Sequence, residues 1–275
     1  MAAADLKSWI GRGWERRDVM DDRLLAAFKA TLSPHLSGVE AVPPGLFWCL
    51  CPDIVEPEQL GSDGHPRLGL FTPEVGLPRR MWAGGELTCH AAFQPGDQVT
   101  KRSIIADIAM KSGKSGELCF ITVNNEYRAR DMLIVGERQD IVYRAAPSST
   151  GAGALGPRSD PPAGSWQVEA TPTLLFRYSA LTFNGHRIHY DYPYATGVEG
   201  YAGLVVHGPL QATLLLNRAT QELGRFPAIF SYRGLAPLIS GQTFSVAAAR
   251  ETGGSLIVRA IAADVGGRAI DRFGL

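Results

Sequence analysis

Residues 183–191 read FNGHRIHYD and place an amide, two imidazoles, a guanidinium, a phenol and a carboxylate within one short segment. An imidazole has an unperturbed pKa of about 6.5, so His186 and His189 could exchange protons near neutral pH. The same pair could also begin a metal site, but HxxH offers no third ligand at a clear spacing. We therefore expect acid–base chemistry from this segment, and no metal.

The flanking sequence predicts the elements that position these groups. The preceding run LLFRYSALTF, residues 174–183, has the spacing of a short helix that ends near Phe183, and Gly185 then permits a turn. The two histidines are thus predicted to lie on a loop, where binding and catalytic groups are often carried. Residues 209–223 are apolar on nearly every face, which predicts a helix surrounded by protein, with Pro209 in its first turn.

The chain is predicted to consist of two similar halves. Residues 146–165 are rich in Gly, Pro, Ser and Ala, which is typical of a linker. Strand-like runs separated by glycine turns lie on both sides of it, around 113–116 in the first half and at Gly253-Gly254 in the second. This repeated order indicates one fold used twice, although the apolar helix makes the second half different.

Composition limits the classes of function. Lys plus Arg equals Asp plus Glu at 27 each, so the bulk charge does not favour a nucleic acid as partner. No apolar run approaches the ~20 residues that a membrane span needs. The cysteines lack CxxC spacing, and acidic residues within 1–32 argue against a transit peptide, so we expect reduced thiols and a cytoplasmic protein. The N-terminal segment is predicted to begin with amphipathic helices.

The spacing of residues between 178 and 208 resembles the signature of the (R)-specific enoyl-CoA hydratases and MaoC-like dehydratases. That signature has Tyr, a small residue, Gly-Asp, any residue, Asn-Pro, an aliphatic residue, His, any residue and Asp, and a later His-Gly at the start of a central helix. The corresponding residues here are Tyr178, Ser179, Asn184, His186, Ile188, His189, Asp191, His207 and Gly208. Over the full length, including RRMWAGGEL at 79–87, the chain resembles the long double hot-dog thioester hydratases of this superfamily.

This resemblance implies an α+β double hot-dog fold, in which two curved antiparallel sheets each wrap on a helix. It divides the chain into a non-catalytic N-terminal repeat over 1–145 that forms a pocket wall, a linker over 146–165 and a C-terminal repeat over 166–275 that carries the motif. One active site per chain is expected, because the first half has no Asn-x4-His ahead of a His-Gly. The sequence leaves open whether two chains pair as a homodimer.

The resemblance also implies roles for individual residues. His189 takes the position of the catalytic histidine, and Asn184 stands where family members have the catalytic aspartate, although an amide cannot accept a proton. His189 would then carry the proton alone, while Asn184 orients water through its carbonyl oxygen. The backbone N–H of Gly208, at the positive end of the predicted helix, would bind the thioester oxygen as an enolate develops. No cofactor is implied.

Substrate contacts are predicted from proximity to the motif. If the substrate carries a free carboxylate, Arg187, Arg80 or His186 could supply the cation that binds it. The consecutive glycines of WAGGE are interpreted as a wall of the acyl pocket, with close approach of a partner strand or a turn as alternatives. The predicted substrate-binding residues are Tyr178, His186, Arg187, Gly84 and Gly85.

The predicted activity is the reversible addition of water to an α,β-unsaturated acyl-CoA, with mesaconyl-CoA or itaconyl-CoA as the substrate and citramalyl-CoA as the product. A 3-hydroxyacyl-thioester dehydratase of fatty-acid synthesis is an alternative that would need an apolar tunnel. A thioesterase on the same fold would need a carboxylate near the central helix, for which Glu86 and Glu199 are available. Because of Asn184, a thioester-binding protein without catalysis is a further alternative.

Overall fold

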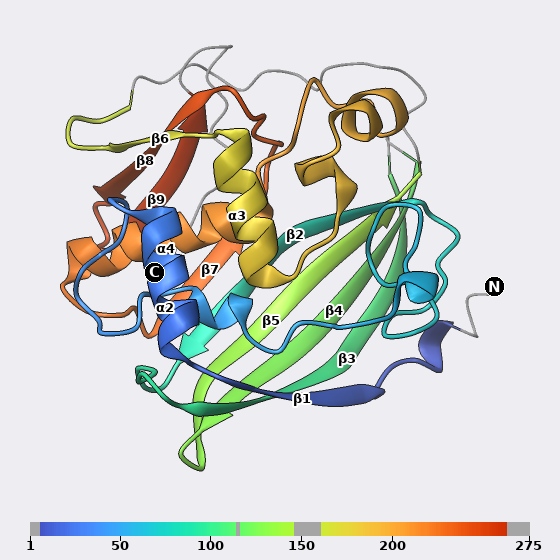
Figure 1. The fold of residues 1–275 in the computed structure, drawn as a ribbon, viewed down its shortest axis with the longest axis horizontal. Coiled ribbons are helices and arrows are strands. Elements are labelled where there is room, and N and C mark those ends of the chain that lie inside the picture. The colour runs from blue at the N-terminus through green and yellow to red at the C-terminus, as the bar shows by residue number, and fades with distance from the viewer. Residues whose placement is uncertain (1–5, 114–115, 146–160, 263–275) are drawn as a thin grey trace.

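The computed structural model describes residues 6–113, 116–145 and 161–262, so most of the predicted linker lies outside the described part. Within these residues two antiparallel sheets dominate the structure (Figure 1). One has six strands in the order β1-β3-β4-β5-β2-β7, and the other has three in the order β6-β8-β9. The strands span Gly13–Val19 (β1), Arg79–Cys89 (β2), Gln98–Gly113 (β3), Gly116–Ala129 (β4), Met132–Arg144 (β5), Trp166–Glu169 (β6), Ile229–Arg233 (β7), Thr243–Arg250 (β8) and Leu256–Ala262 (β9).

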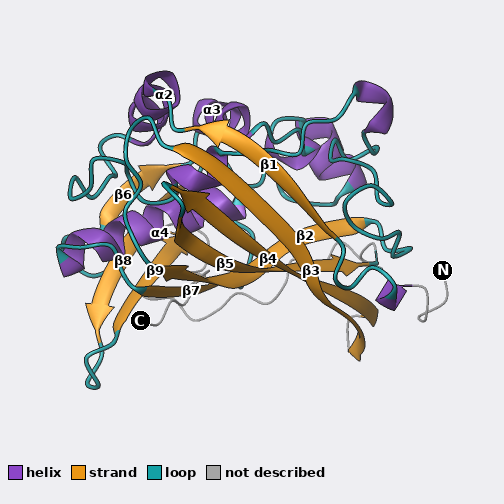
Figure 2. Ribbon diagram, turned by 90° about the horizontal axis from the view of Figure 1, so that it is seen from below, coloured by secondary structure: helices purple, strands orange, loops and turns teal. Residues whose placement is uncertain are grey.

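The long strands β3, β4 and β5 form the curved centre of the six-stranded sheet (Figure 2). The predicted hairpin is confirmed, because Gly113 of β3 pairs with Gly116 of β4. The next hairpin turns at Arg130 and Asp131, whose φ angles of 50° and 57° suit a two-residue turn between twisted strands. β7 belongs to the second half of the chain but pairs with β2. The six-stranded sheet therefore contains residues from both halves.

The predicted apolar helix is confirmed as α4, Gly208–Leu223. Pro209 lies in its first turn, and Gly224 ends it in the left-handed conformation with φ of 67°. Ten of its sixteen residues are buried, because α4 packs against β8 and β9 and also touches β2. In Figure 1 it runs behind α2 and α3, next to the three-stranded sheet. This enclosure explains why its sequence is apolar on nearly every face.

Two shorter helices, α2 (Asp22–Leu32) and α3 (Pro172–Thr182), lie side by side (Figures 1 and 2). Each begins at a side-chain cap, provided by Asp21 and Thr171 respectively. The resemblance implied a helix within each sheet. In the described first half, the buried segment nearest to that role is the 3-10 helix η1, Leu46–Cys49, whereas the long central helix belongs to the second half.

The N-terminal segment differs from the predicted succession of amphipathic helices. Residues 13–19 form β1, which pairs with β3 along its whole length, and α2 follows. Pairing with a long neighbouring strand outweighs the local pattern here, as strand formation depends strongly on tertiary context. Among the helices of the described chain, none is long and apolar enough to cross a bilayer.

Two apolar clusters fill the interior. The larger surrounds α4 and reaches both sheets, and the smaller lies on β3, β4 and β5 near Leu77. Members of both clusters, among them Tyr127, Tyr178 and Tyr143, line one cavity of about 1110 Å³. The fold thus leaves a large cavity where the second-half motif faces the first-half sheet.

Candidate active site

The segment that we call the motif loop, residues 184–193, follows α3 as predicted. Phe183 ends the helix in the left-handed conformation with φ of 50°. The turn was expected at Gly185, but this residue has no positive φ; its lack of a side chain instead admits Gly64 of the first half. A Cβ on Gly185 would lie 2.8 Å from the carbonyl oxygen of Gly64. The motif loop is thereby packed against a loop of the first half.

His189 ends the 3-10 helix η3, Arg187–His189, and its side chain is oriented by one hydrogen bond. The Nδ1 atom lies 2.7 Å from the carbonyl oxygen of Val205. Because a carbonyl only accepts, Nδ1 carries the proton and Nε2 keeps its lone pair. Nε2 has no hydrogen-bond partner in the part of the chain that the structure describes. Burial lowers the pKa of His189 to about 3, so the ring is a neutral base at neutral pH.

His207 stacks on His189, with ring centres 3.6 Å apart and planes inclined by 18°. It is fully buried directly before α4, and its Nε2 lies 2.8 Å from the hydroxyl of Ser179. Its Nδ1 has no partner among the described residues. Burial, with a smaller effect of His189, holds the pKa of His207 well below its usual value. The stack anchors His189 at the start of α4.

The N-terminus of α4 has an available backbone donor. His207 precedes the helix without forming a side-chain cap, and the first intrahelical bond runs from Gln211 N–H to the His207 carbonyl. The N–H of Gly208 therefore has no hydrogen bond to any described residue, and it lies at the positive end of the helix dipole. A Cβ on Gly208 would lie 2.6 Å from Cε3 of Trp82. Packing against Trp82 thus already requires glycine, without any ligand.

The cavity of about 1110 Å³ opens next to this arrangement. Ser179, Asn184 and Pro209 are among its lining residues, whereas His189 and Gly208 are not. The cavity therefore reaches the immediate neighbours of the predicted base and of the predicted backbone donor.

Asn184 lines the cavity at the start of the motif loop. Its Oδ1 accepts from the backbone N–H of His186 at 3.0 Å, and its own backbone N–H donates to Ser179 at 2.9 Å. The carbonyl oxygen that was expected to orient water is thus already used by the loop. The amide nitrogen has no described partner and can donate a hydrogen bond into the cavity.

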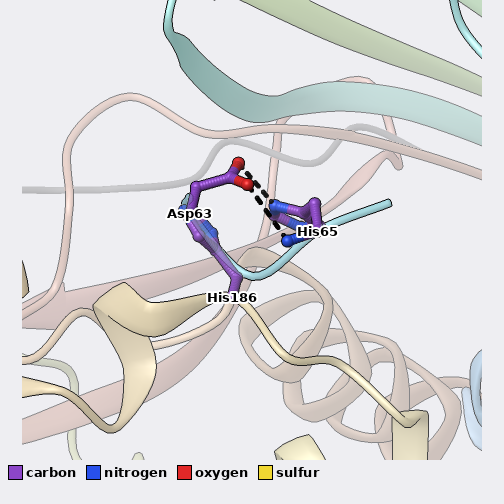
Figure 3. A group of neighbouring side chains, drawn as sticks. All are labelled: Asp63, His65 and His186. Atoms are coloured by element: carbon purple, nitrogen blue, oxygen red, sulfur yellow. Dashed lines mark hydrogen bonds and ion pairs between the residues drawn. The ribbon is translucent and has the colours of Figure 1, made fainter. Parts of the chain in front are cut away.

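His186 belongs to a cluster with Asp63 and His65, two residues of the first half (Figure 3). The rings of His65 and His186 have centres 4.2 Å apart, and Oδ2 of Asp63 lies 3.1 Å from Nδ1 of His65. Arg80 of β2 donates to Nε2 of the same imidazole at 2.9 Å. Burial and the Arg80 charge lower the pKa of His65, and burial, with a smaller effect of neighbouring basic groups that include Arg80, lowers the pKa of His186. Both imidazoles are therefore neutral at neutral pH.

The ligand-type atoms of Asp63, His65 and His186 lie within 4.8 Å of one another, as in a metal site. The contact with Arg80 argues against a cation here. A guanidinium only donates, so Nε2 of His65 is the acceptor and Nδ1 carries the proton, which leaves neither nitrogen a lone pair for a metal. The positive charge of Arg80 would also oppose a bound cation.

Arg187 was predicted to bind substrate, but its charge is paired with Asp191 and three of its five guanidinium donors contact protein oxygens. Its guanidinium donates to Oδ2 of Asp191 at 2.7 and 2.9 Å and to the Ser62 carbonyl at 3.0 Å. Its backbone N–H donates to the Asp63 carbonyl at 2.8 Å. These contacts correct the prediction, because Arg187 ties the motif loop to the first half. The guanidinium also lowers the pKa of Asp191, which serves as its structural partner.

Tyr178, another predicted substrate-binding residue, is fully buried yet borders the cavity. Its hydroxyl lies 3.3 Å from Oγ1 of Thr213 on α4, and its ring packs edge-on against His207 with centres 5.1 Å apart. Burial raises the pKa of Tyr178 well above its usual value. Its phenol therefore stays neutral and supports the packing of α3 on α4.

Gly84 and Gly85 do not line the cavity. A Cβ on Gly84 would lie 2.6 Å from the carbonyl oxygen of Tyr232, and one on Gly85 would lie 2.5 Å from the hydroxyl of the same tyrosine. The predicted pocket wall is thus corrected in favour of the packing alternative. These glycines let β7 and its tyrosine approach β2 closely.

Residues 45–240 match the family model of hydroxyacyl-thioester dehydratase type 2. The chain belongs to this family. It is 42% identical over 257 residues to the mesaconyl-C(4)-CoA hydratase of Chloroflexus aurantiacus, a match that covers 90% of each chain. The resemblance expected from the motif is therefore confirmed.

Solved structures place this type 2 dehydratase family member in a known fold. A MaoC-like dehydratase superposes with a TM-score of 0.71, covering 98% of this chain and 99% of its own at 13% identity. A Mycobacterium tuberculosis protein with a double hot-dog fold superposes with a TM-score of 0.55, covering 96% and 95% at 15% identity. These likenesses confirm the α+β double hot-dog fold.

Three residues of this family member's site had no role in the sequence-based prediction. Asp63 and His65 lie in the segment GSDGHP, which by itself indicates only a polar turn, and no spacing rule joins it to a motif in the other half. His207 was matched to the His-Gly pair of the signature, but no role in the site was assigned to it. Its stacking on His189 depends on how the motif loop folds back onto α4.

Proposed function

We propose that this protein is a hydro-lyase that adds water reversibly to an α,β-unsaturated acyl-CoA, with mesaconyl-CoA or itaconyl-CoA as substrate and citramalyl-CoA as product. The observation that carries the proposal is the neutral imidazole of His189, held through Nδ1 by the Val205 carbonyl at the start of α4. The 42% identity to a mesaconyl-C(4)-CoA hydratase supports the substrate.

The proposed reaction uses one water and one base. With mesaconyl-CoA, whose double bond is conjugated with the thioester, Nε2 of His189 takes a proton from water as the water oxygen bonds to the β-carbon, and the double-bond electrons move onto the thioester oxygen. The resulting enolate oxygen is stabilised by the N–H of Gly208 and the positive end of α4. The proton then passes from Nε2 to the α-carbon, which completes the addition and restores the neutral ring. The amide of Asn184 positions the water or the thioester.

The lowered pKa of His189 suits this cycle. At neutral pH nearly every molecule has the unprotonated ring that the first step needs. Once formed, the buried imidazolium is a strong acid, which favours transfer of the proton to carbon. The same low pKa makes the ring a weaker base, so the developing enolate must be well stabilised by the helix terminus.

A 3-hydroxyacyl-thioester dehydratase of fatty-acid synthesis is the second candidate. The family description supports it, and so does a large cavity lined by Trp48, Leu50, Tyr127 and Ile141, whose side chains suit an acyl chain. The same base and backbone donor would then act in the direction of water loss. Turnover of long-chain 3-hydroxyacyl thioesters above that of C5 dicarboxylyl thioesters would favour this candidate.

The thioesterase alternative is weakened by the contacts of its two carboxylates. Glu86 accepts a hydrogen bond from Ser231 at 2.7 Å, and Glu199 forms a buried ion pair with Arg79 at 2.7 Å. Both carboxylates are thus engaged by protein groups, and Glu86 does not line the cavity. A binding protein without catalysis would keep its ligand affinity and show no turnover.

Acyl-CoA is the proposed partner, and we expect one site per chain in a cytoplasmic enzyme. In this proposal the first half supplies a pocket wall through the loop that carries Asp63 and His65. Whether two copies form a homodimer is measured by light scattering across a concentration series.

The direct test offers mesaconyl-CoA, itaconyl-CoA, crotonyl-CoA and a long-chain 3-hydroxyacyl-CoA separately to the purified protein. Mass spectrometry follows the gain or loss of one water, and a thiol reagent follows free CoA. Hydration of a dicarboxylyl thioester supports the proposal. Release of CoA without hydrated product would instead identify a thioesterase, and unchanged substrates that nevertheless bind, as measured by calorimetry, would identify a binding protein.

A further inference from the structure

One basic side chain that lines the cavity beside the motif loop forms no ion pair with any residue that the structure describes. Four basic side chains line the cavity within the described residues, namely Arg67, Arg79, Arg80 and Lys101. Arg79 is neutralised by its buried ion pair with Glu199. Arg67 is exposed, and the ammonium of Lys101 lies over the ring of Tyr127, 5.4 Å from its centre. Of the four, Arg80 is the one that contacts the His65–His186 cluster.

The guanidinium of Arg80 is fixed by a neutral partner. Its NH1 donates to Nε2 of His65 at 2.9 Å, and Asp63 holds the opposite nitrogen of that ring. The carboxylate of Asp63 makes no direct ion pair with Arg80, because the imidazole lies between them. The remaining donors of Arg80 have no hydrogen bond in the described chain. They are available to an anion in the cavity that Arg80 lines.

Ring contacts connect this cation to the predicted base. His65 stacks against His186 with centres 4.2 Å apart, and His186 packs edge-on against His189 with centres 5.3 Å apart. Two neighbouring imidazoles, His65 and His186, thus connect Arg80 to His189, so an anion held by Arg80 would lie near the motif loop. The three imidazoles are neutral and do not compete with Arg80 for it.

The proposed substrates carry an anion close to the reaction. In a mesaconyl thioester the free carboxylate is attached to the β-carbon, the same carbon that receives water. Removing this anion from solvent is costly unless a hydrogen-bonded cation compensates it. A planar guanidinium can bind both oxygens of a carboxylate at once.

We propose that Arg80, oriented by the Asp63–His65 pair, binds the free carboxylate of a dicarboxylyl thioester and thereby sets substrate specificity. This inference rests on the proposed function and names its specificity residue. It also gives a function to the contact between the first-half loop that carries Asp63 and His65 and the motif loop of the second half. Arg187 cannot take this role, because Asp191 and Ser62 engage its guanidinium.

The test compares Arg80→Gln with Arg102→Gln, which removes the same charge from an exposed position of β3 outside the cavity. Arg80→Gln is expected to lower kcat/KM for mesaconyl-CoA by about 30-fold or more. Its kcat/KM for crotonyl-CoA, which lacks the carboxylate, is expected to change by less than about threefold. Arg80→Lys should fall between Arg80→Gln and wild type for the dicarboxylyl substrate, because it keeps the charge and loses the planar pair of donors.

A binding measurement separates specificity from chemistry. Succinyl-CoA and butyryl-CoA are saturated thioesters that differ by one carboxylate, and each is used as a competitive inhibitor. Arg80→Gln should raise the inhibition constant of succinyl-CoA and leave that of butyryl-CoA unchanged. If Arg80→Gln does not fold, as judged by circular dichroism, Arg80→Lys gives the same comparison.

The outcomes distinguish this inference from the proposed function. Equal losses on mesaconyl-CoA and crotonyl-CoA, or no loss on either, would overturn the role of Arg80 and leave the hydratase proposal intact. If the wild-type protein hydrates crotonyl-CoA but not mesaconyl-CoA, the proposal of a dicarboxylyl substrate is wrong. The proposed role of Arg80 in binding its free carboxylate is then wrong as well. A loss confined to mesaconyl-CoA and succinyl-CoA supports the inference.

Discussion

The imidazoles of His189 and His207 lie nearly parallel, with centres 3.6 Å apart, in front of the first turn of α4. Two protonated rings at this separation would repel each other strongly in a buried environment. His207 must therefore stay neutral whenever His189 carries the proton during turnover. The hydroxyl of Ser179 at Nε2 of His207 fixes that ring without supplying a charge. The stack keeps the base oriented and allows one proton at a time.

Replacing His189 with Gln should abolish most turnover, because an amide can fill part of the space but cannot take a proton from water. We expect kcat to fall by roughly two to four orders of magnitude. The matched control is His90→Gln, which changes an exposed histidine at the end of β2. Initial rates of hydration are the measurement. Activity of His189→Gln near that of the control would refute the assignment of the base.

Stability should fall as the pH is lowered below neutral, because the four histidines of the site have lowered pKa values: the buried His186, His189 and His207 and the partly buried His65. The unfolded chain takes up protons near pH 6.5, whereas the folded protein does so only at lower pH, so acid favours unfolding. Each histidine adds a slope of at most about 1.4 kcal/mol per pH unit between these limits.

Urea denaturation at pH 7.5, 6.0 and 5.0 measures this dependence as the free energy of unfolding. His207→Gln is the comparison, since it removes one of the four groups and should flatten the slope. A free energy of unfolding that stays constant from pH 7.5 to 5.0 would show that these histidines are not held neutral by the fold.

Replacing Gly208 with Ala should destabilise the protein, because the new Cβ would lie 2.6 Å from Cε3 of Trp82. Overpacking of this kind typically costs about 1 to 3 kcal/mol. In Gly208→Ala/Trp82→Leu the clash is removed, so the double variant should lose less stability than the two single variants together. Urea denaturation of the four proteins gives the coupling. Strictly additive losses would contradict the contact.

Local signals explain which elements the sequence predicted. α4 was predictable because an apolar pattern and a proline in the first turn agree over one segment. The hairpin between Gly113 and Gly116 was predictable because strand-like runs lie on both sides of a glycine-containing turn. In each case the information lies within a few residues of the element that it specifies.

Long-range contacts explain most of what the sequence did not reveal. β1 is a strand because it pairs with β3, although amphipathic helices were expected in the N-terminal segment. The turn after α3 lies at Phe183 instead of Gly185 because the glycine is needed where the first-half loop approaches. The contact of His65 with His186 joins two halves of the chain, and no local pattern encodes it.

Replacing Asn184 with Asp should shift the pH dependence of catalysis. In the wild-type protein the low pKa of His189 keeps the base unprotonated, so kcat/KM should stay constant between pH 8 and about 5. A carboxylate at position 184 adds negative charge to the cavity beside neutral imidazoles, which raises their pKa values. The acid limb of the kcat/KM profile should therefore move upward by about one to two pH units.

Asn184→Ala is the control for this shift, because it removes the amide without adding charge and should lower kcat/KM while leaving the acid limb in place. Profiles of kcat/KM between about pH 4 and 8.5 are compared at constant ionic strength, because a limb moved to about pH 4 to 5 lowers kcat/KM at the acid end of this range while the wild-type profile stays nearly flat. An acid limb that does not move in Asn184→Asp would mean that the side chain at position 184 does not share its electrostatic environment with the base. The water-positioning role of Asn184 would then lose its support, while the assignment of His189 would rest on its own variant.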